Sequence, residues 1–252
     1  MIQRQELEGY MLEVIGVYKS YGRNKVLKNI SFKIFPGELL FLLGNNGAGK
    51  TTLLNIISSI NPMSKGEVLV NGVNIKDRPI DAKRNLAYIV DDVKAFEFLT
   101  GGEFLEFVAS IYKLDNKDGI IKRYVTLFQM DNYLNQMIST YSSGMKKKIM
   151  IISCLIRNPS VLIMDEPTNG LDIGSHQVLF NEIRSLANNK TILIATHDRY
   201  IIEGLIAMGV KSKIAIIKDG KIAALDTFEN LKRRYNKKTI AEVFLEVYSY
   251  EK

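Results

Sequence analysis

The sequence predicts an α/β fold built around a parallel sheet. Three short apolar runs, at residues 39–43, 161–164 and 191–195, have the length and composition of buried strands, and each is followed by polar residues. Stretches with helical periodicity lie between them, and alternating strands and helices favour a parallel sheet. Because such sheets bind ligands at the carboxyl ends of their strands, we expect the functional residues directly after these runs.

The first of these strands runs into a glycine-rich turn. Residues 44–51 read Gly-x-x-x-x-Gly-Lys-Thr, and Leu53, Ile56, Ile57 and Ile60 follow at helical spacing. Strand, glycine-rich turn and helix are the context that a P-loop requires, which disfavours an ordinary βα turn. Backbone N–H groups and the helix N-terminus would hold phosphates, with Lys50 at the β- and γ-phosphates and Thr51 on Mg²⁺. The residues expected to bind nucleotide here are Gly44, Asn45, Asn46, Gly47, Ala48, Gly49, Lys50, Thr51 and Thr52.

The composition is that of a globular protein of 252 residues, long enough for one sizeable α/β domain or two small ones. We expect no membrane span, because no apolar segment approaches the roughly 18–20 residues that a span needs. The polar first residues do not resemble a secretory signal. The single cysteine, Cys154, fits a reducing cytoplasm and is expected to be a buried structural thiol. The formal charge of +7 comes partly from residues 146–148 and 232–238, which we interpret as solvated helix faces in preference to sites for anionic lipid or nucleic acid.

An antiparallel β subdomain is predicted around the P-loop. Strands are expected at residues 12–18 and 26–34, separated by a turn near Gly22. After the P-loop helix, Asn71-Gly72 lies between two short apolar runs, and this dipeptide is typical of a hairpin with a type I′ turn. A further strand is expected at 86–90.

A helical insertion is predicted at about residues 96–157. Thr100 and Glu103 have the spacing of a capping box that opens a helix with Phe104, Phe107, Val108 and Ile111 on one face. The strand–helix alternation then resumes, and we expect one domain over residues 1–252 that ends in an amphipathic helix at about 239–248. The remaining predicted elements are helices at 119–129, from 142 to before 158, at 174–188 and at 198–207, and strands at 161–164, 191–195, 213–217 and 221–224.

Two acidic residues follow the strand at 161–164. Asp165 is placed to hold Mg²⁺ through water, and Glu166 is placed to accept a proton from an attacking water. The apolar strand before them disfavours a plain acidic surface turn. His197 follows the strand at 191–195 and is expected to hydrogen-bond the γ-phosphate and the attacking water. The other histidine, His176, lies in a polar helical stretch and is interpreted as structural.

Small hydroxyl residues and glycine at Ser142, Ser143 and Gly144 form a helix N-terminus that favours an anion, although this signal alone is weak. Together with the preceding motifs, it makes the chain resemble the nucleotide-binding subunit of an ATP-binding cassette (ABC) transporter over nearly its whole length. The resemblance implies a RecA-like P-loop NTPase core and a helical subdomain that bears the signature loop. It assigns Walker A to residues 44–51, the end of Walker B to Asp165 and Glu166, the signature to 141–145, the D-loop to 169–172 with Asp172, the switch histidine to His197 and the adenine-stacking aromatic to Tyr21.

The sequence departs from the family pattern in two places. The signature has Ser143 for the first glycine and Met145 for the glutamine, as in bacterial exporters that resemble the ABC-2 type. The glutamine expected after Tyr88-Ile89-Val90 is Asp91, whose carboxylate can ligate Mg²⁺ or water but cannot donate a hydrogen bond when ionised. A role in shaping the coupling loop is the preferred interpretation of Asp91, and metal ligation is the alternative.

The resemblance implies an ATPase subunit that binds ATP and Mg²⁺ and drives transport, with export favoured, by head-to-tail dimer closure. Ser142, Ser143 and Gly144 of one subunit would close on ATP held by the other. The expected partners are an integral membrane permease and a second ABC ATPase chain, identical or not, with no nucleic acid. The expected location is the cytoplasmic face of the cell membrane, with residues 91–107 toward the permease.

Three questions stay open at this stage. Phe96, Phe98 and Leu99 suit either a contact with the permease or the core of the helical subdomain. A non-transport ABC ATPase that acts on a cluster-assembly scaffold or a ribosome is the alternative function. A P-loop kinase or GTPase is a third class, but it would lack the signature and D-loop motifs.

Overall fold

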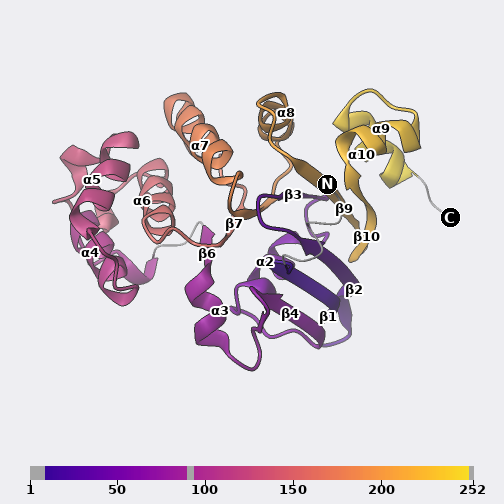
Figure 1. Cartoon of the computed structure of the whole chain (residues 1–252), viewed down its shortest axis with the longest axis horizontal. Coiled ribbons are helices and arrows are strands. Elements are labelled where there is room, and N and C mark those ends of the chain that lie inside the picture. Colours follow the sequence, from indigo (N-terminus) through magenta and orange to yellow (C-terminus); the bar gives the residue numbers. More distant parts are fainter. Residues whose placement is uncertain (1–8, 90–93, 250–252) are drawn as a thin grey trace.

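The computed structural model describes residues 9–89 and 94–249. A six-stranded sheet forms the centre, a second, four-stranded sheet lies on one side of it, and helices cover the other side (Figure 1). The strands are β1 (Leu12–Tyr21), β2 (Asn24–Ile34), β3 (Leu39–Leu43), β4 (Lys65–Val70), β5 (Val73–Asn74), β6 (Leu86–Ile89), β7 (Val161–Asp165), β8 (Thr191–Ala195), β9 (Ser212–Lys218) and β10 (Lys221–Thr227). The α-helices are α2 (Lys50–Ile57), α3 (Pro79–Asn85), α4 (Gly101–Ile111), α5 (Lys117–Leu127), α6 (Ser143–Leu155), α7 (Ile173–Leu186), α8 (Arg199–Ala207), α9 (Phe228–Tyr235) and α10 (Ile240–Ser249).

The central sheet has the strand order β10-β9-β3-β8-β7-β6, in which β9, β3, β8, β7 and β6 run parallel and β10 is antiparallel to β9. Its register places Leu42 of β3 and Asp165 of β7 on either side of Ala195 of β8. The residues that follow these strands therefore begin at one edge of the sheet. The predicted parallel α/β core is confirmed.

The second sheet has the order β2-β1-β4-β5 and is antiparallel throughout, as predicted. Asn71 and Gly72, between β4 and β5, both have positive φ, at 50° and 72°. A type I′ turn requires positive φ at both central residues, and asparagine and glycine adopt it at the lowest cost.

The side chains of β3 alternate between two apolar cores, and every residue of the strand is buried. Leu40 and Leu42 face a core shared with α2 and the antiparallel sheet, so α2 is packed between the two sheets. Leu39, Phe41 and Leu43 face the core beneath the helices of the opposite layer. Burial on both faces is why β3 reads as an uninterrupted apolar run.

The helical subdomain begins with α4, and the predicted capping box is present. The Thr100 hydroxyl accepts from Glu103 N–H at 3.2 Å, and the Glu103 carboxylate accepts from Thr100 N–H at 2.8 Å. The predicted apolar face is only partly correct. Phe104 is buried, but Phe107 and Ile111 are 46% and 57% exposed, because Leu105 and Ala109 supply much of the buried side instead.

Phe96, Phe98 and Leu99 do not share one environment. Phe96 and Leu99 pack against the core, with the Phe96 ring 4.9 Å from the ring of Phe104. Phe98 is 69% exposed. Core packing therefore explains two of these residues, and Phe98 is left at the surface.

Two helices and the position of Ile60 differ from the prediction, whereas the burial of Cys154 agrees with it. Helices α3 and α9 were not predicted, and Ile60 lies beyond the end of α2 with 57% exposure instead of on its buried face. Cys154 is buried as expected, its thiol donates to the Tyr88 carbonyl at 3.5 Å, and burial raises its pKa to about 11. Among the residues that the structure describes, no helix has the length and apolarity that crossing a membrane requires.

The correction at Ile60 gives a matched test of the packing of α2. Ile56→Ala removes a fully buried side chain between the two sheets and should lower the free energy of unfolding by about 2–5 kcal/mol. Ile60→Ala removes the same atoms from an exposed position and should change it by no more than about 0.5 kcal/mol. Denaturant unfolding of both variants is the measurement, and equal losses would contradict the placement of α2.

Candidate nucleotide-binding site

The P-loop lies between β3 and α2 and is held tightly by its neighbours. Gly49 has φ 105°, and a Cβ there would lie 2.7 Å from Leu27 of β2. A Cβ on Gly44 would lie 2.5 Å from the Ile217 side chain of β9. Both positions therefore require glycine, one for conformation and close approach and the other for close approach alone.

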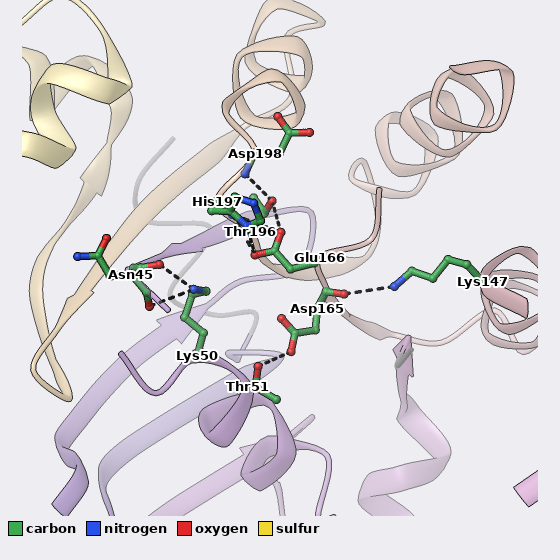
Figure 2. Close-up of polar contacts among 10 residues, drawn as sticks. Asn45, Lys50, Thr51, Lys147, Asp165, Glu166, Thr196, His197 and Asp198 are labelled. Atoms are coloured by element: carbon green, nitrogen blue, oxygen red, sulfur yellow. Dashed lines mark hydrogen bonds and ion pairs between the residues drawn. The ribbon is translucent and has the colours of Figure 1, made fainter. Parts of the chain in front are cut away.

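Lys50, the first residue of α2, is 7% exposed and points back into the loop (Figure 2). Its ammonium donates to the carbonyls of Gly44, at 2.7 Å, and Asn45, at 3.4 Å. The N-terminus of α2 has no side-chain cap. A buried ammonium group and uncapped N–H groups at one point make a concave site of positive potential that suits a phosphate chain.

Thr51 and Asp165 meet across the gap between α2 and β7. The Thr51 hydroxyl donates to Asp165 Oδ2 at 2.6 Å (Figure 2). A hydroxyl and a carboxylate are hard oxygen ligands of the kind that Mg²⁺ prefers. The two residues that the sequence assigned to Mg²⁺ therefore lie together and fit that ion in their chemistry.

Glu166 and His197 form a pair at the ends of β7 and β8. His197 Nδ1 lies 2.7 Å from Glu166 Oε1, and the same carboxylate accepts from the His197 backbone N–H and from the Thr196 hydroxyl. Glu166 has φ 44°, an uncommon conformation for glutamate, and its side chain is directed along the end of β8 (Figure 2). The glutamate side chain is 16% exposed and the histidine 65%, so the pair borders solvent on the histidine side.

The signature loop contacts the D-loop of the same chain. Ser142 caps α6 by accepting from Met145 N–H at 3.2 Å, and Ser143 and Gly144 form the first turn. A Cβ on Gly144 would lie 2.6 Å from the carbonyl of Gly170. The helix that carries the signature is therefore seated directly on the segment that follows Glu166.

Asp172 strengthens this contact. It caps α7 by accepting from Ser175 N–H at 2.8 Å, and its carboxylate pairs with Lys148 of α6 at 2.7 Å. The bond from Lys148 and then the bond from Ser175 hold the pKa of Asp172 well below its usual range. The carboxylate is thus directed into its own chain.

The remaining predicted residues have separate surroundings. Tyr21 is 49% exposed at the end of β1, with the Lys19 ammonium 4.7 Å from its ring centroid, so part of the ring remains accessible. His176, in α7, has its Nε2 2.8 Å from the carbonyl of Thr168, which precedes that helix, in keeping with the structural interpretation. Asp91 lies outside the described residues.

Sequence reasoning missed three contributors to the site. Lys147 is not on a solvated helix face as expected: it is 4% exposed, and its ammonium donates to the Asp165 carbonyl at 3.4 Å. Thr196 is fully buried against Glu166, and its place directly before His197 was the available signal. Tyr248 contacts the P-loop from α10.

This site can be compared with known proteins. The family model described as "ABC transporter" matches residues 27–169. The chain belongs to the ABC transporter family. It carries the ATPase domain of that family, which agrees with the resemblance seen in the motifs.

Two relatives illustrate the range of the match. The chain is 31% identical to the Fe(3+) ions import ATP-binding protein FbpC of Fusobacterium nucleatum over 88% of its own length and 60% of that protein's. It is 31% identical to the linearmycin resistance ATP-binding protein LnrL of Bacillus subtilis over 92% of its own length and 74% of that protein's. The chain therefore spans 60% and 74% of the lengths of these two relatives.

A solved structure described as the ATP-binding subunit of an ABC transporter superposes with a TM-score of 0.86 at 27% identity, covering 95% of this chain and all of the other. A second, a dimeric ATP-binding cassette bound to ADP and phosphate, has a TM-score of 0.76 at 23% identity, with 86% and 98% coverage. The predicted ABC cassette fold is thereby confirmed.

Proposed function

We propose that this chain hydrolyses ATP to drive a membrane transporter, and that it does so as one half of a head-to-tail pair of ATPase chains. The observation that carries the proposal is the convergence of Lys50, the Thr51–Asp165 pair and the Glu166–His197 pair at one edge of the sheet. Each lies directly after a buried strand or in the first turn of α2, where rigid elements fix its position.

The phosphates of ATP would bind along residues 44–52, with Tyr21 against the adenine. Lys50 would exchange its bonds to the Gly44 and Asn45 carbonyls for the β- and γ-phosphates. Both partners are oxygen acceptors, so the buried ammonium stays hydrogen-bonded throughout. Mg²⁺ would be held by Thr51 and Asp165, and the chemistry it supplies is neutralisation of phosphate charge.

Glu166 would accept the proton of the attacking water. Its hydrogen bonds from Thr196 and from the His197 backbone hold the carboxylate in place. His197 would contact the γ-phosphate through Nε2. When a neutral imidazole donates from Nδ1 to Glu166, its Nε2 can only accept a hydrogen bond. To donate to both Glu166 and the γ-phosphate, the His197 ring must carry a proton on each nitrogen.

Two arguments support a shared site. The signature residues Ser142, Ser143 and Gly144 are seated on the D-loop, and α6 lies to one side of β7 whereas α2 lies on the other (Figure 1). The N-terminus of α6 can then serve a phosphate of a second chain. Ile173, the first residue of α7, is 88% exposed beside Asp172, which suits burial against such a chain.

The permease would dock on the helical subdomain, at the cytoplasmic face of the membrane. Phe98, Phe107 and Ile111 are large apolar side chains exposed on this subdomain. Phe98 and Phe107 belong to the segment at residues 91–107 that the family resemblance assigns to coupling. Asp91, as proposed from the sequence, would act in that segment by shaping the loop, with metal ligation as the alternative role. Export is favoured by the Tyr-Ser-x-Gly-Met form of the signature and accords with the resistance function in the name of one relative.

The role of Glu166 predicts a specific defect. Glu166→Gln keeps the shape of the side chain but removes the proton acceptor, so turnover should fall roughly 10²–10⁴-fold while ATP binding survives. ATP hydrolysis and equilibrium binding are measured in parallel on the same preparation. Hydrolysis at the wild-type rate would exclude Glu166 as the base.

The shared site predicts complementation between inactive chains. Lys50→Ala disables the P-loop and Ser142→Arg disables the signature, so mixing the two should rebuild one complete site per mixed pair and restore part of the activity. Each variant alone, at the same total concentration, is the control. No recovery on mixing, together with a rate per chain that does not depend on concentration, would contradict the shared site.

The transport function predicts a membrane partner. Affinity purification of the tagged chain from detergent-solubilised membranes should recover an integral membrane protein. Phe98→Ser should reduce that recovery, and Ile60→Ser, at a position that is also exposed but lies outside the helical subdomain, should not. Recovery of ribosomal proteins or an assembly scaffold instead would favour the non-transport alternative.

A further inference from the structure

The last described helix reaches back to the first residues of the P-loop. The hydroxyl of Tyr248, in α10, accepts from the Asn45 backbone N–H at 2.9 Å and donates to the Ile217 carbonyl of β9 at 2.6 Å. One phenol group thus bridges three segments: the P-loop, the neighbouring strand and the C-terminal helix. Asn45 lies 203 positions and Ile217 lies 31 positions before Tyr248 in the sequence.

Helix α10 is fixed well enough to hold that hydroxyl in place. Ile240, Val243 and Val247 are buried, and the Phe244 and Tyr248 rings lie 4.4 Å apart. The Lys218 ammonium donates to the Tyr248 carbonyl at 2.8 Å and to the Val247 carbonyl at 3.4 Å, which satisfies acceptors at the helix end. The position of the phenol is therefore set by packing and by a cation at the helix terminus.

The peptide group that Tyr248 contacts is the same one that holds Lys50. Between Gly44 and Asn45, the N–H donates to Tyr248 and the C=O accepts from the Lys50 ammonium at 2.7 Å. A peptide group is planar and trans, so its N–H and C=O point in opposite directions and turn together. Fixing the N–H consequently fixes the direction of the carbonyl and, through it, the resting position of the ammonium.

Helix α10 and the P-loop leave a space between them. A pocket of about 370 Å³ lies between α10 and the P-loop, lined by Asn45 and Asn46 on one side and by Ala241, Phe244 and Leu245 on the other. The hydrogen bond from Asn45 to the Tyr248 hydroxyl links the loop directly to the helix.

We propose that Tyr248 is a positioning residue for ATP binding, which orients the Gly44–Asn45 peptide and with it Lys50, and that α10 is thereby coupled to the occupancy of the P-loop. The inference rests on the proposed binding of ATP at residues 44–52. Coupling between two sites is reciprocal. If the α10 contact favours the conformation that binds ATP, bound ATP must stabilise the α10 contact.

Tyr248→Phe tests this by removing one oxygen atom and keeping the ring. The variant loses two hydrogen bonds, from Asn45 and to Ile217, of which the bond from Asn45 bears on the P-loop. Water can reach Asn45, which is exposed, so the effect on ATP binding should be that of this one hydrogen bond. We expect the Kd for a non-hydrolysable ATP analogue and the KM for Mg-ATP to rise about 3- to 10-fold, with kcat changed less than KM. Tyr235→Phe, the same change on α9, is the matched control and should alter neither constant.

Amide hydrogen exchange separates positioning from a general structural role. In Tyr248→Phe, the Asn45 amide should exchange faster while buried amides of β3 keep their wild-type rates. The ATP analogue should slow exchange in α10 of the wild type and have less effect on α10 of the variant. A general structural role would instead lower the melting temperature and kcat, with KM unchanged, and would overturn the inference.

The outcomes also distinguish this inference from the proposed function. A wild-type protein that binds no ATP would overturn both. Wild-type and Tyr248→Phe proteins that bind the analogue equally well would overturn the role of Tyr248 alone. Should the variant unfold at a lower temperature, Kd is measured below both melting transitions, and an unchanged Kd there still rejects the proposal.

Discussion

The parallel ladder of β3, β8 and β7 is the constraint on which the site depends. Its register aligns Leu42, Ala195 and Asp165, so the P-loop, the Thr196–His197 segment and Glu166 all start from one edge. None of the three segments would have a fixed relation to the others without those backbone hydrogen bonds. Buried apolar side chains on both faces of β3 hold the ladder in register, because a shift of one residue would exchange its two cores.

Buried cations organise the polar groups at this edge. Lys50 and Lys147 are both buried, and each donates to a backbone carbonyl near the site. Burying an ammonium group is costly unless hydrogen bonds compensate, which explains why the carbonyls of Gly44, Asn45 and Asp165 are directed at these two groups. Lys147 and Lys148 also tie α6 to the Walker B strand and to Asp172. A displacement of α6 must therefore move or break contacts at this edge of the sheet.

The sequence predicted well those features that local chemistry specifies. The Walker motifs, the capped start of α4 and the Asn71-Gly72 turn each depend on a few adjacent residues whose conformation has a single favourable form. Features that depend on an unknown neighbour were not predictable. The pairing of Glu166 with His197 requires β7 and β8 to be adjacent, and a list of strands does not give their order.

The prediction of which helical residues are buried was partly wrong for a related reason. Phe107 and Ile111 repeat with the period of a buried face, but periodicity cannot distinguish a core from a surface that another protein would cover. Helix α9 did carry a signal, since Phe228, Leu231 and Tyr235 are spaced three and four residues apart, and the surrounding basic residues obscured it. The contact of Tyr248 with Asn45 joins segments whose separation gives no pattern at all.

The environment of Cys154 has a practical consequence for studying conformational change. Thiol reagents attack the thiolate, and this sulfur is both shielded from solvent and held as a thiol at neutral pH by its raised pKa. Because it is the single cysteine of the chain, we expect maleimide reagents to leave the native protein unlabelled. Pairs of cysteines introduced at exposed positions such as Ile173 and Phe98 would accept spin labels or fluorophores without removal of a native residue. Distances between α7 and the helical subdomain then become measurable in an otherwise unaltered protein.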